Sequence, residues 1–260
     1  MKKFVALLLA VLMVASLCAC GQKDTGSDLQ TVTKGKLIMS TNAQFPPYES
    51  VADDGKGYEG TGFEGIDIEI AYALAQKLGL ELVVDDMDFD SALSAVQTGK
   101  SDIVAAGVTV TPERQNTMCF TDSYANGVQV VIVKEGSDIK SIDDLEGKQI
   151  GTQRGTTGYS YCTDDYGEDS VVAFDDGATA VQNLLAGKVD CVVIDKAPAQ
   201  EYVKANAGLT ILDTEYANEN YAIGLGKDNT ALQEALNKAL AELKADGTIQ
   251  SIIDKYIPAK

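Results

Sequence analysis

Glycine, threonine and arginine cluster in the stretch AAGVTVTPER, residues 105–114, in a pattern that suits a small anion. An apolar run ends at Gly107, and Thr109 precedes an expected helix start with Thr111 as N-cap and a proline behind it. Backbone N–H groups, hydroxyls and the Arg114 guanidinium could together hold a carboxylate or a phosphate. An ordinary strand–loop–helix junction with a solvated arginine is the alternative, and this stretch alone favours it.

Histidine is absent from the sequence, which narrows the chemistry open to this chain. The commonest general base and zinc ligand are missing, and Ser-His-Asp and Cys-His catalysis are excluded. Cys119, Cys162 and Cys191 have no CxxC spacing, so we expect three buried free thiols, with a Cys162–Cys191 bridge left open. We expect no metal, no cofactor and no catalytic residue.

The N-terminus has the pattern of a secretory signal peptide. Two lysines precede an apolar run, 4–17, that is shorter than the roughly 20 residues of a membrane-spanning helix. The run ends in LCACG, which resembles the bacterial lipobox and predicts a lipoprotein signal peptide over 1–19 and lipidation of Cys20. Simple cleavage without lipidation is the alternative. The polar segment 20–34 is expected to form a flexible tether.

Acidic side chains outnumber basic ones by 39 to 21, which gives a formal net charge of −18. This charge argues against nucleic acid as a partner, because a phosphate backbone needs a basic surface. It also argues against adhesion to anionic lipid, so the lipid anchor is the only membrane link that we expect.

Alternating strand and helix patterns must position the chemically active residues. Apolar and β-branched runs predict strands at 36–41, 81–84, 102–106, 128–133, 171–174 and 189–194. Helical spacing predicts a helix that ends at Gly79 and a last helix that runs from a Thr230–Gln233 capping box to Gly247. The alternation predicts an α/β fold with parallel sheets.

Two internal echoes suggest two lobes of related topology. AVQTGKSDIV at 95–104 is matched by NLLAGKVDCV at 183–192, and both place Gly-Lys-x-Asp before a buried strand. A second echo relates GKLI at 35–38 to GKQI at 147–150.

The first echo predicts where a ligand would lie. Open α/β sheets bind ligands beyond the carboxyl ends of their strands. At the offset of this echo, Gly107 matches Asp195, and each follows the corresponding strand of its own lobe. If the lobes face each other, these positions meet across a cleft that the loops 42–45 and 153–157 also line.

The order of these motifs resembles that of solute-binding family 3, the polar amino-acid-binding proteins that serve ABC importers. The resemblance covers nearly all of 35–257 and is carried by TNAQFPPYE, GFEGIDIEIAYALAQKLG, MDFDSALSAVQTGKSDIVAAGVTVTPER, GTQRGTTG and AGKVDCVVID. It implies a two-lobed clamp of the periplasmic-binding-protein-like type II class, with a mainly parallel sheet flanked by helices in each lobe. The implied division is lobe 1 from 35–124 and 221–260, lobe 2 from 125–220, and hinge strands near 124–128 and 217–221.

The resemblance also implies a function. A free L-amino acid would be captured by closure of the lobes and delivered to ABC permease subunits in the membrane. The lipoprotein start fits a monomer tethered at the extracellular face of the membrane of a Gram-positive-type bacterium. The alternatives are an amino-acid-sensing receptor for a signalling partner and a dehydratase or lyase on the same scaffold, with Glu49 as the remaining free carboxylate.

Roles in the site follow from the resemblance. Arg114 from lobe 1 would grip the α-carboxylate, with support from Thr109, Thr156 and Thr157. Asp195 from lobe 2 would hold the ammonium group, unless it is only a capping or surface aspartate. The ligand would thereby bridge the two lobes.

The remaining matched positions surround the ligand side chain. The Gly107 carbonyl would assist with the ammonium group, and Ala106 beside it belongs to the same wall. Phe45 and Phe89 match aromatic positions that sandwich the ligand side chain, although either could be plain core.

Two neutral residues bear on ligand choice. Asn42 and Gln153 favour a polar uncharged ligand such as glutamine. A basic ligand stays open because three acidic side chains could reach the pocket: Glu49, Asp88 and Asp165. An acidic ligand is least expected, because Arg154 should point to solvent.

Overall fold

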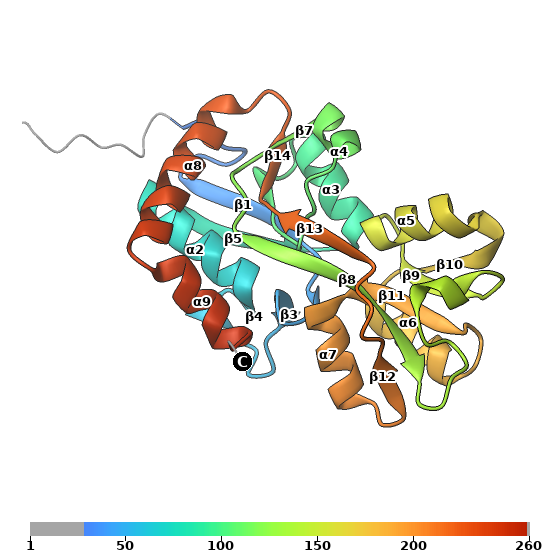
Figure 1. The fold of residues 1–260 in the computed structure, drawn as a ribbon. Helices are drawn as coiled ribbons and strands as arrows, with labels where there is room; N and C mark the ends of the chain where they lie inside the picture. The colour runs from blue at the N-terminus through green and yellow to red at the C-terminus, as the bar shows by residue number, and fades with distance from the viewer. Residues whose placement is uncertain (1–28, 259–260) are drawn as a thin grey trace, which may run out of the picture.

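A computed structural model describes residues 29–258 and consists of two lobes joined by two strands (Figure 1). The two-lobed α/β class predicted from the sequence is confirmed. The predicted signal peptide, Cys20 and most of the predicted tether lie outside the described residues. None of the helices within 29–258 combines the length and the apolar character that crossing a membrane requires.

The first large sheet has the strand order β5-β1-β6-β14-β7. Its strands are β1 (Lys36–Thr41), β5 (Glu81–Asp86), β6 (Ile103–Val104), β7 (Met118–Phe120) and β14 (Gly224–Gly226). Helices α2 (Ile66–Leu78), α8 (Thr230–Ala245) and α9 (Thr248–Tyr256) pack on one face, and α3 (Phe89–Gln97) packs on the other. Successive side chains of β6 point to opposite faces of the sheet, so Ile103 packs with α2 and α8 in one core and Val104 packs with α3 in the other.

The second large sheet has the order β10-β9-β11-β8-β12, with β13 paired to β8. Its strands are β8 (Ala125–Lys134), β9 (Ile150–Gln153), β10 (Val171–Phe174), β11 (Cys191–Asp195), β12 (Leu209–Ile211) and β13 (Ala217–Tyr221). Helices α5 (Thr157–Tyr166), α6 (Gly177–Leu185) and α7 (Lys196–Ala205) flank it. Val192 and Val193 alternate between its two apolar cores, again as the pleat requires.

Short elements complete the described chain. A small sheet joins β2 (Gln44–Phe45), β3 (Glu49–Val51) and β4 (Phe63–Glu64). The 3₁₀ turns are η1 (Tyr58–Gly60), η2 (Ile142–Leu145) and η3 (Glu168–Ser170), and α4 (Pro112–Thr117) follows the Arg-containing loop.

Strands β8 and β13 carry the chain between the lobes as an antiparallel pair (Figure 1). Gly127 of β8 lies opposite Glu219 of β13, and a Cβ on Gly127 would come within 2.4 Å of the Tyr221 ring. Only glycine therefore lets the ring pack against this strand. The predicted hinge positions fall on these strands, and the lobe boundaries stay a prediction.

The two echoes occupy equivalent places in the lobes. Each of the four echoed glycines has a positive φ between 71° and 80°. Asp102 accepts the Ile38 N–H at 2.7 Å, and Asp190 accepts the Gln149 N–H at 2.8 Å. In each lobe, one aspartate thus ties the start of a buried strand to its parallel neighbour.

Several predictions of local structure were wrong in detail. The sheets are mixed rather than wholly parallel. The crossover strands β8 and β13, and the strands β7 and β14 that adjoin them in the chain, pair antiparallel without helical crossovers. The expected capping box at the start of α8 is absent, since Gln233 donates to the Phe120 carbonyl instead. Gly247 ends that helix as expected, but α9 beyond it was not predicted.

The three cysteines of the described residues are free thiols, so the bridge left open by the sequence does not form. Cys162 and Cys191 are buried, as expected. Cys119 is only half-buried, because it lies on β7 at the edge of the first sheet.

Candidate functional site

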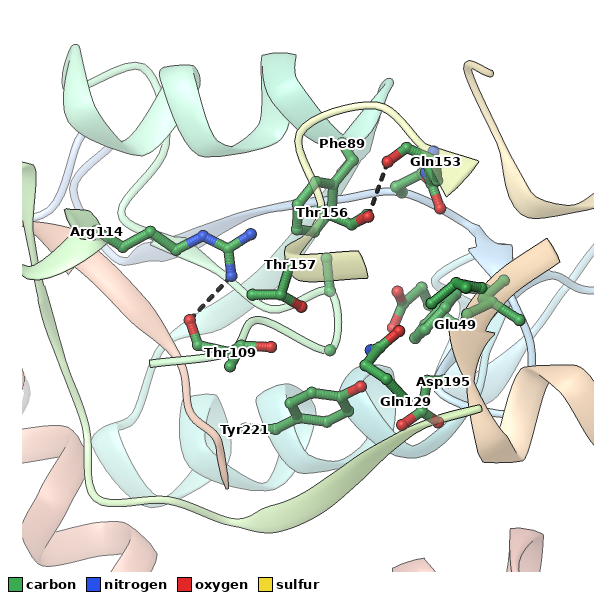
Figure 2. Close-up of a pocket in the computed structure, with 16 residues that line it drawn as sticks. Glu49, Phe89, Thr109, Arg114, Gln129, Gln153, Thr156, Thr157, Asp195 and Tyr221 are labelled. Carbon is green, nitrogen blue, oxygen red and sulfur yellow. Dashed lines mark hydrogen bonds between the residues drawn. The ribbon is translucent and has the colours of Figure 1, made fainter. Parts of the chain in front are cut away.

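A cavity lies between the two lobes (Figure 2). It is lined by Asn42, Phe45, Glu49, Phe89, Ala106, Gly107, Thr109, Arg114, Gln129, Gln153, Thr156, Thr157, Val193, Ile194, Asp195 and Tyr221. All eleven residues that the sequence predicted for ligand contact are in this wall. The structure therefore brings them together, and their individual ligand contacts stay predictions.

Arg114 enters the cavity from the first turn of α4. The helix begins as predicted, because the Thr111 hydroxyl accepts the Arg114 N–H at 3.1 Å and Pro112 is the first helical residue. The guanidinium donates to the Thr109 carbonyl at 2.9 Å and, across the cleft, to the Gly155 carbonyl at 3.1 Å. Burial lowers the pKa of Arg114, and the nearby Glu219 opposes that shift. Arginine stays charged in proteins, so the remaining N–H groups present a cation to the cavity.

Aromatic rings flank the guanidinium and the neighbouring loop. The Arg114 Cζ atom lies 5.4 Å from the centroid of the Phe89 ring, within the range of a cation–π contact. Gly107 has a φ of +55°, and a Cβ there would come within 2.9 Å of Phe45. Glycine is thus needed for both the backbone conformation and the close approach of the ring.

The second lobe contributes the start of α5. Thr156 caps this helix and its hydroxyl donates to the Gln153 carbonyl at 2.7 Å (Figure 2). Thr157, the first helical residue, lines the same cavity as Arg114 and Thr109. A helix N-terminus carries unpaired N–H groups and a partial positive charge, so this corner of the cavity suits an anionic group.

Asn42 and Gln153 meet across the cleft. The Gln153 amide donates to the Asn42 side-chain oxygen at 2.9 Å and to the Asp175 carbonyl at 3.2 Å. The Asn42 amide in turn donates to the Met87 carbonyl. Because these two side chains are engaged with each other, their neutrality is a weaker guide to the ligand than the sequence suggested.

Asp195 ends β11 and caps α7. Its two oxygens accept the Ala197 N–H at 3.0 Å and the Val128 N–H at 2.8 Å. Burial raises the pKa of Asp195 to about 6, against the lowering effect of those two backbone donors. The capping role considered as an alternative is thus present. It leaves each oxygen a second lone pair for a cationic group in the cavity.

Glu49 is the acidic residue that the sequence analysis named only as one of three possibilities. It is fully buried in β3 and lines the cavity, and neither of its oxygens has a hydrogen-bond partner among residues 29–258. The other two residues do not line the cavity: Asp88 caps α3, and Asp165 accepts a hydrogen bond from the Tyr216 hydroxyl. Arg154 lies outside the cavity, exposed and paired with Asp175, as expected.

Four further wall residues were not predicted. Gln129 and Tyr221 come from the crossover strands β8 and β13, and Val193 and Ile194 precede Asp195 in β11. Gln129 donates to Glu219 at 2.9 Å. No local sequence pattern indicates these contacts, since they depend on how the crossover strands pair.

A cleft between two α/β lobes, with a half-buried cation from one lobe and a buried carboxylate from the other, is typical of a solute-binding protein of the clamp type. The chain matches the family model "Bacterial extracellular solute-binding proteins, family 3" over residues 37–259, and it belongs to that family. Family members are solute-binding proteins rather than enzymes, and the family implies an extracellular or periplasmic location.

The similar proteins are amino-acid-binding proteins. The chain is 33% identical to the arginine-binding extracellular protein ArtP of Bacillus subtilis, over 98% of each chain. An ancestral arginine-binding protein bound to glutamine is 40% identical, with a TM-score of 0.81 over 87% of this chain and 100% of that one. An ancestral arginine-binding protein bound to arginine is 41% identical, with a TM-score of 0.78 over 85% of this chain and 98% of that one.

Proposed function

We propose that this protein is the lipid-anchored substrate-binding component of an ABC importer for a cationic L-amino acid, with arginine as the leading candidate. The observation that carries the choice of ligand is Glu49, a fully buried carboxylate in the cavity wall without a hydrogen-bond partner in the described chain. A buried charge is costly unless it is paired, and a guanidinium or ammonium group of the ligand would supply the pair.

The α-carboxylate of the ligand would bind Arg114. The free N–H groups of the guanidinium, the hydroxyl groups of Thr109 and Thr157 and the start of α5 gather at this end of the cavity (Figure 2). A planar guanidinium can donate two parallel hydrogen bonds to a carboxylate. The α-ammonium group would bind Asp195 and the Gly107 carbonyl.

The ligand side chain would run from this end toward Glu49. Figure 2 shows Arg114 and Glu49 at opposite ends of the cavity, which suits a long ligand with a charge at each end. Phe45 and Phe89 supply apolar walls for its methylene groups. Glutamine is the second candidate, because Asn42 and Gln153 are neutral and one similar structure contains glutamine.

Closure of the lobes would couple binding to transport. In our proposal lobe 1 comprises 35–124 and 221–260, and lobe 2 comprises 125–220. The Tyr202 hydroxyl of α7 donates to the Gln44 carbonyl of β2 at 2.9 Å, which supports a closed form held by contacts outside the ligand. The permease would recognise this form, and lipidated Cys20 would hold the monomer at the extracellular face of the membrane.

Calorimetry with a panel of amino acids tests the choice of ligand. We expect arginine to bind more tightly than glutamine, with glutamate weakest. Glu49→Gln leaves the ligand cation without its buried partner, so arginine affinity should fall by about 2–5 kcal/mol, roughly 30- to 5,000-fold. Glutamine affinity should change far less. Glu64→Gln, an exposed glutamate on the neighbouring strand β4, is the matched control. Tighter binding of glutamine to the parent protein, or arginine affinity retained in Glu49→Gln, would contradict the proposal.

A further inference from the structure

Two buried carboxyl groups are neighbours at the edge of the cavity: Glu49 lines it, and Asp67 lies behind it, where its N–H donates to the carbonyl of Tyr48, the residue before Glu49, at 2.9 Å. Glu49 comes from β3 and Asp67 from the first turn of α2, and both are almost completely buried. Neither Glu49 oxygen has a hydrogen-bond partner in the described chain, nor does Asp67 Oδ1. Asp67 Oδ2 accepts the Gly107 N–H at 2.8 Å. Asp67 therefore links this carboxyl pair to the loop that carries Gly107.

The groups that face the pair bring no positive charge. They are Asp86 from β5, Tyr48 beside Glu49, Tyr124 before β8 and Tyr202 from α7, and Asp195 from β11 lines the same cavity as Glu49. No lysine or arginine is among these neighbours in residues 29–258. Asp86 and Asp195 are themselves engaged with backbone N–H groups. The pair must therefore be neutralised by something other than a basic side chain.

Two ionised carboxylates that are buried close together repel each other, and their burial removes most of the hydration that would stabilise the charges. Burial, followed by the neighbouring Asp67, raises the pKa of Glu49 well above its ordinary value. Burial also raises the pKa of Asp67 to about 6. Carboxyl pairs of this kind retain one proton between them over a wide pH range.

We propose that Glu49 and Asp67 share one proton in the ligand-free protein, and that the cationic side chain of the bound amino acid displaces it. The proton passes to solvent, and the ligand cation becomes the partner of the doubly ionised pair. This inference rests on the proposed function. A neutral ligand such as glutamine brings no side-chain charge and leaves the proton in place.

Displacement makes capture of arginine depend on pH in a defined direction. The free protein must lose a proton when it binds arginine, so affinity rises with pH as long as the free pair is protonated. The expected slope is about tenfold per pH unit, and it levels off above the pKa of the pair. Glutamine affinity should be nearly flat over the same range.

Asp67→Asn isolates the shared proton. The asparagine oxygen can still accept the Gly107 N–H, and its amide can donate to Glu49, which would then be ionised without a proton. Asp102→Asn is the matched control, since Asp102 is a buried aspartate in the same lobe that accepts backbone N–H groups away from the cavity. A purely structural role of Asp67 would change affinity without changing the number of protons released.

Calorimetry of the intact protein with arginine, in buffers of different ionisation enthalpy at pH 7.5, counts the protons. We expect release of about one proton per arginine by the parent protein and Asp102→Asn, and close to none by Asp67→Asn or with glutamine. Asp195, with its pKa near 6, is largely ionised at this pH and contributes little. Arginine binding without proton release would overturn the inference and leave the proposed function intact.

Infrared spectroscopy tests the shared proton without any ligand. The ligand-free parent protein at pH 7.5 should show the C=O band of a protonated carboxyl group, and Asp67→Asn should lack it. This measurement stays decisive even if arginine fails to bind, which would refute the proposed function instead. A spectrum without that band would overturn the inference.

Discussion

Arg114→Lys keeps the positive charge in the cavity but removes the planar fork of the guanidinium. Arg114 already donates to the Thr109 and Gly155 carbonyls, and its other N–H groups have no acceptor within residues 29–258 and can bind a carboxylate. A lysine cannot cover all of these acceptors from one nitrogen. The variant therefore loses at least one bond to the ligand and the bond to Gly155 that crosses the cleft. At about 1.5–3 kcal/mol for each charge-assisted bond, the combined loss is about 3 kcal/mol or more, a fall in affinity of roughly 100-fold.

Calorimetry with the best ligand of the parent protein measures this loss. Thermal unfolding without ligand is the control, because the variant must remain folded for the comparison to hold. Affinity within about threefold of the parent value, with unchanged unfolding, would refute the assignment of the α-carboxylate to Arg114.

Three further variants probe the cleft. Asp195→Asn keeps a capping oxygen, so ligand-free stability should fall by about 1 kcal/mol while calorimetric affinity falls by about 2 kcal/mol or more; equal losses would make Asp195 purely structural. Gly107→Ala places a Cβ at a residue with positive φ and against the Phe45 ring, so denaturant titration should show a loss of at least about 1–2 kcal/mol in the free energy of unfolding. An unchanged unfolding midpoint would contradict the close packing. Tyr202→Phe removes the bond to Gln44 across the cleft, so stopped-flow should show ligand dissociation about fivefold faster; an unchanged rate would mean that this bond does not hold the closed form.

Local patterns in the sequence predicted the elements that hold the site. The Thr111 cap and the proline behind it place Arg114 in a first helical turn, whatever the rest of the fold does. In each echoed Gly-Lys-x-Asp unit, the glycine has a positive φ and the aspartate ties two neighbouring strands together. Both requirements are local, so the repeated sequence correctly marked equivalent parts of the two lobes. Apolar runs predicted the strand positions because a strand that is buried on both faces of its sheet is apolar along its whole length.

Contacts between distant segments could not be predicted in this way. Within residues 29–258, the lack of a basic partner for Glu49 depends on α2, β5 and α7 all presenting acids or phenols near it, which no local pattern records. Gln129 and Tyr221 join the cavity wall only because the crossover strands pair there. The antiparallel pairings of β8 and β14 were also not predictable from local patterns. They arise because the chain crosses between the lobes without an intervening helix.

The central claim is that Arg114 from one lobe and Asp195 from the other hold the two poles of one amino acid. A crystal structure with bound ligand tests it most directly. We expect the ligand carboxylate to accept hydrogen bonds from the Arg114 guanidinium and the ligand ammonium to donate to Asp195. An amino acid bound elsewhere, or bound in this cleft with its carboxylate and ammonium groups away from these two side chains, would contradict the claim.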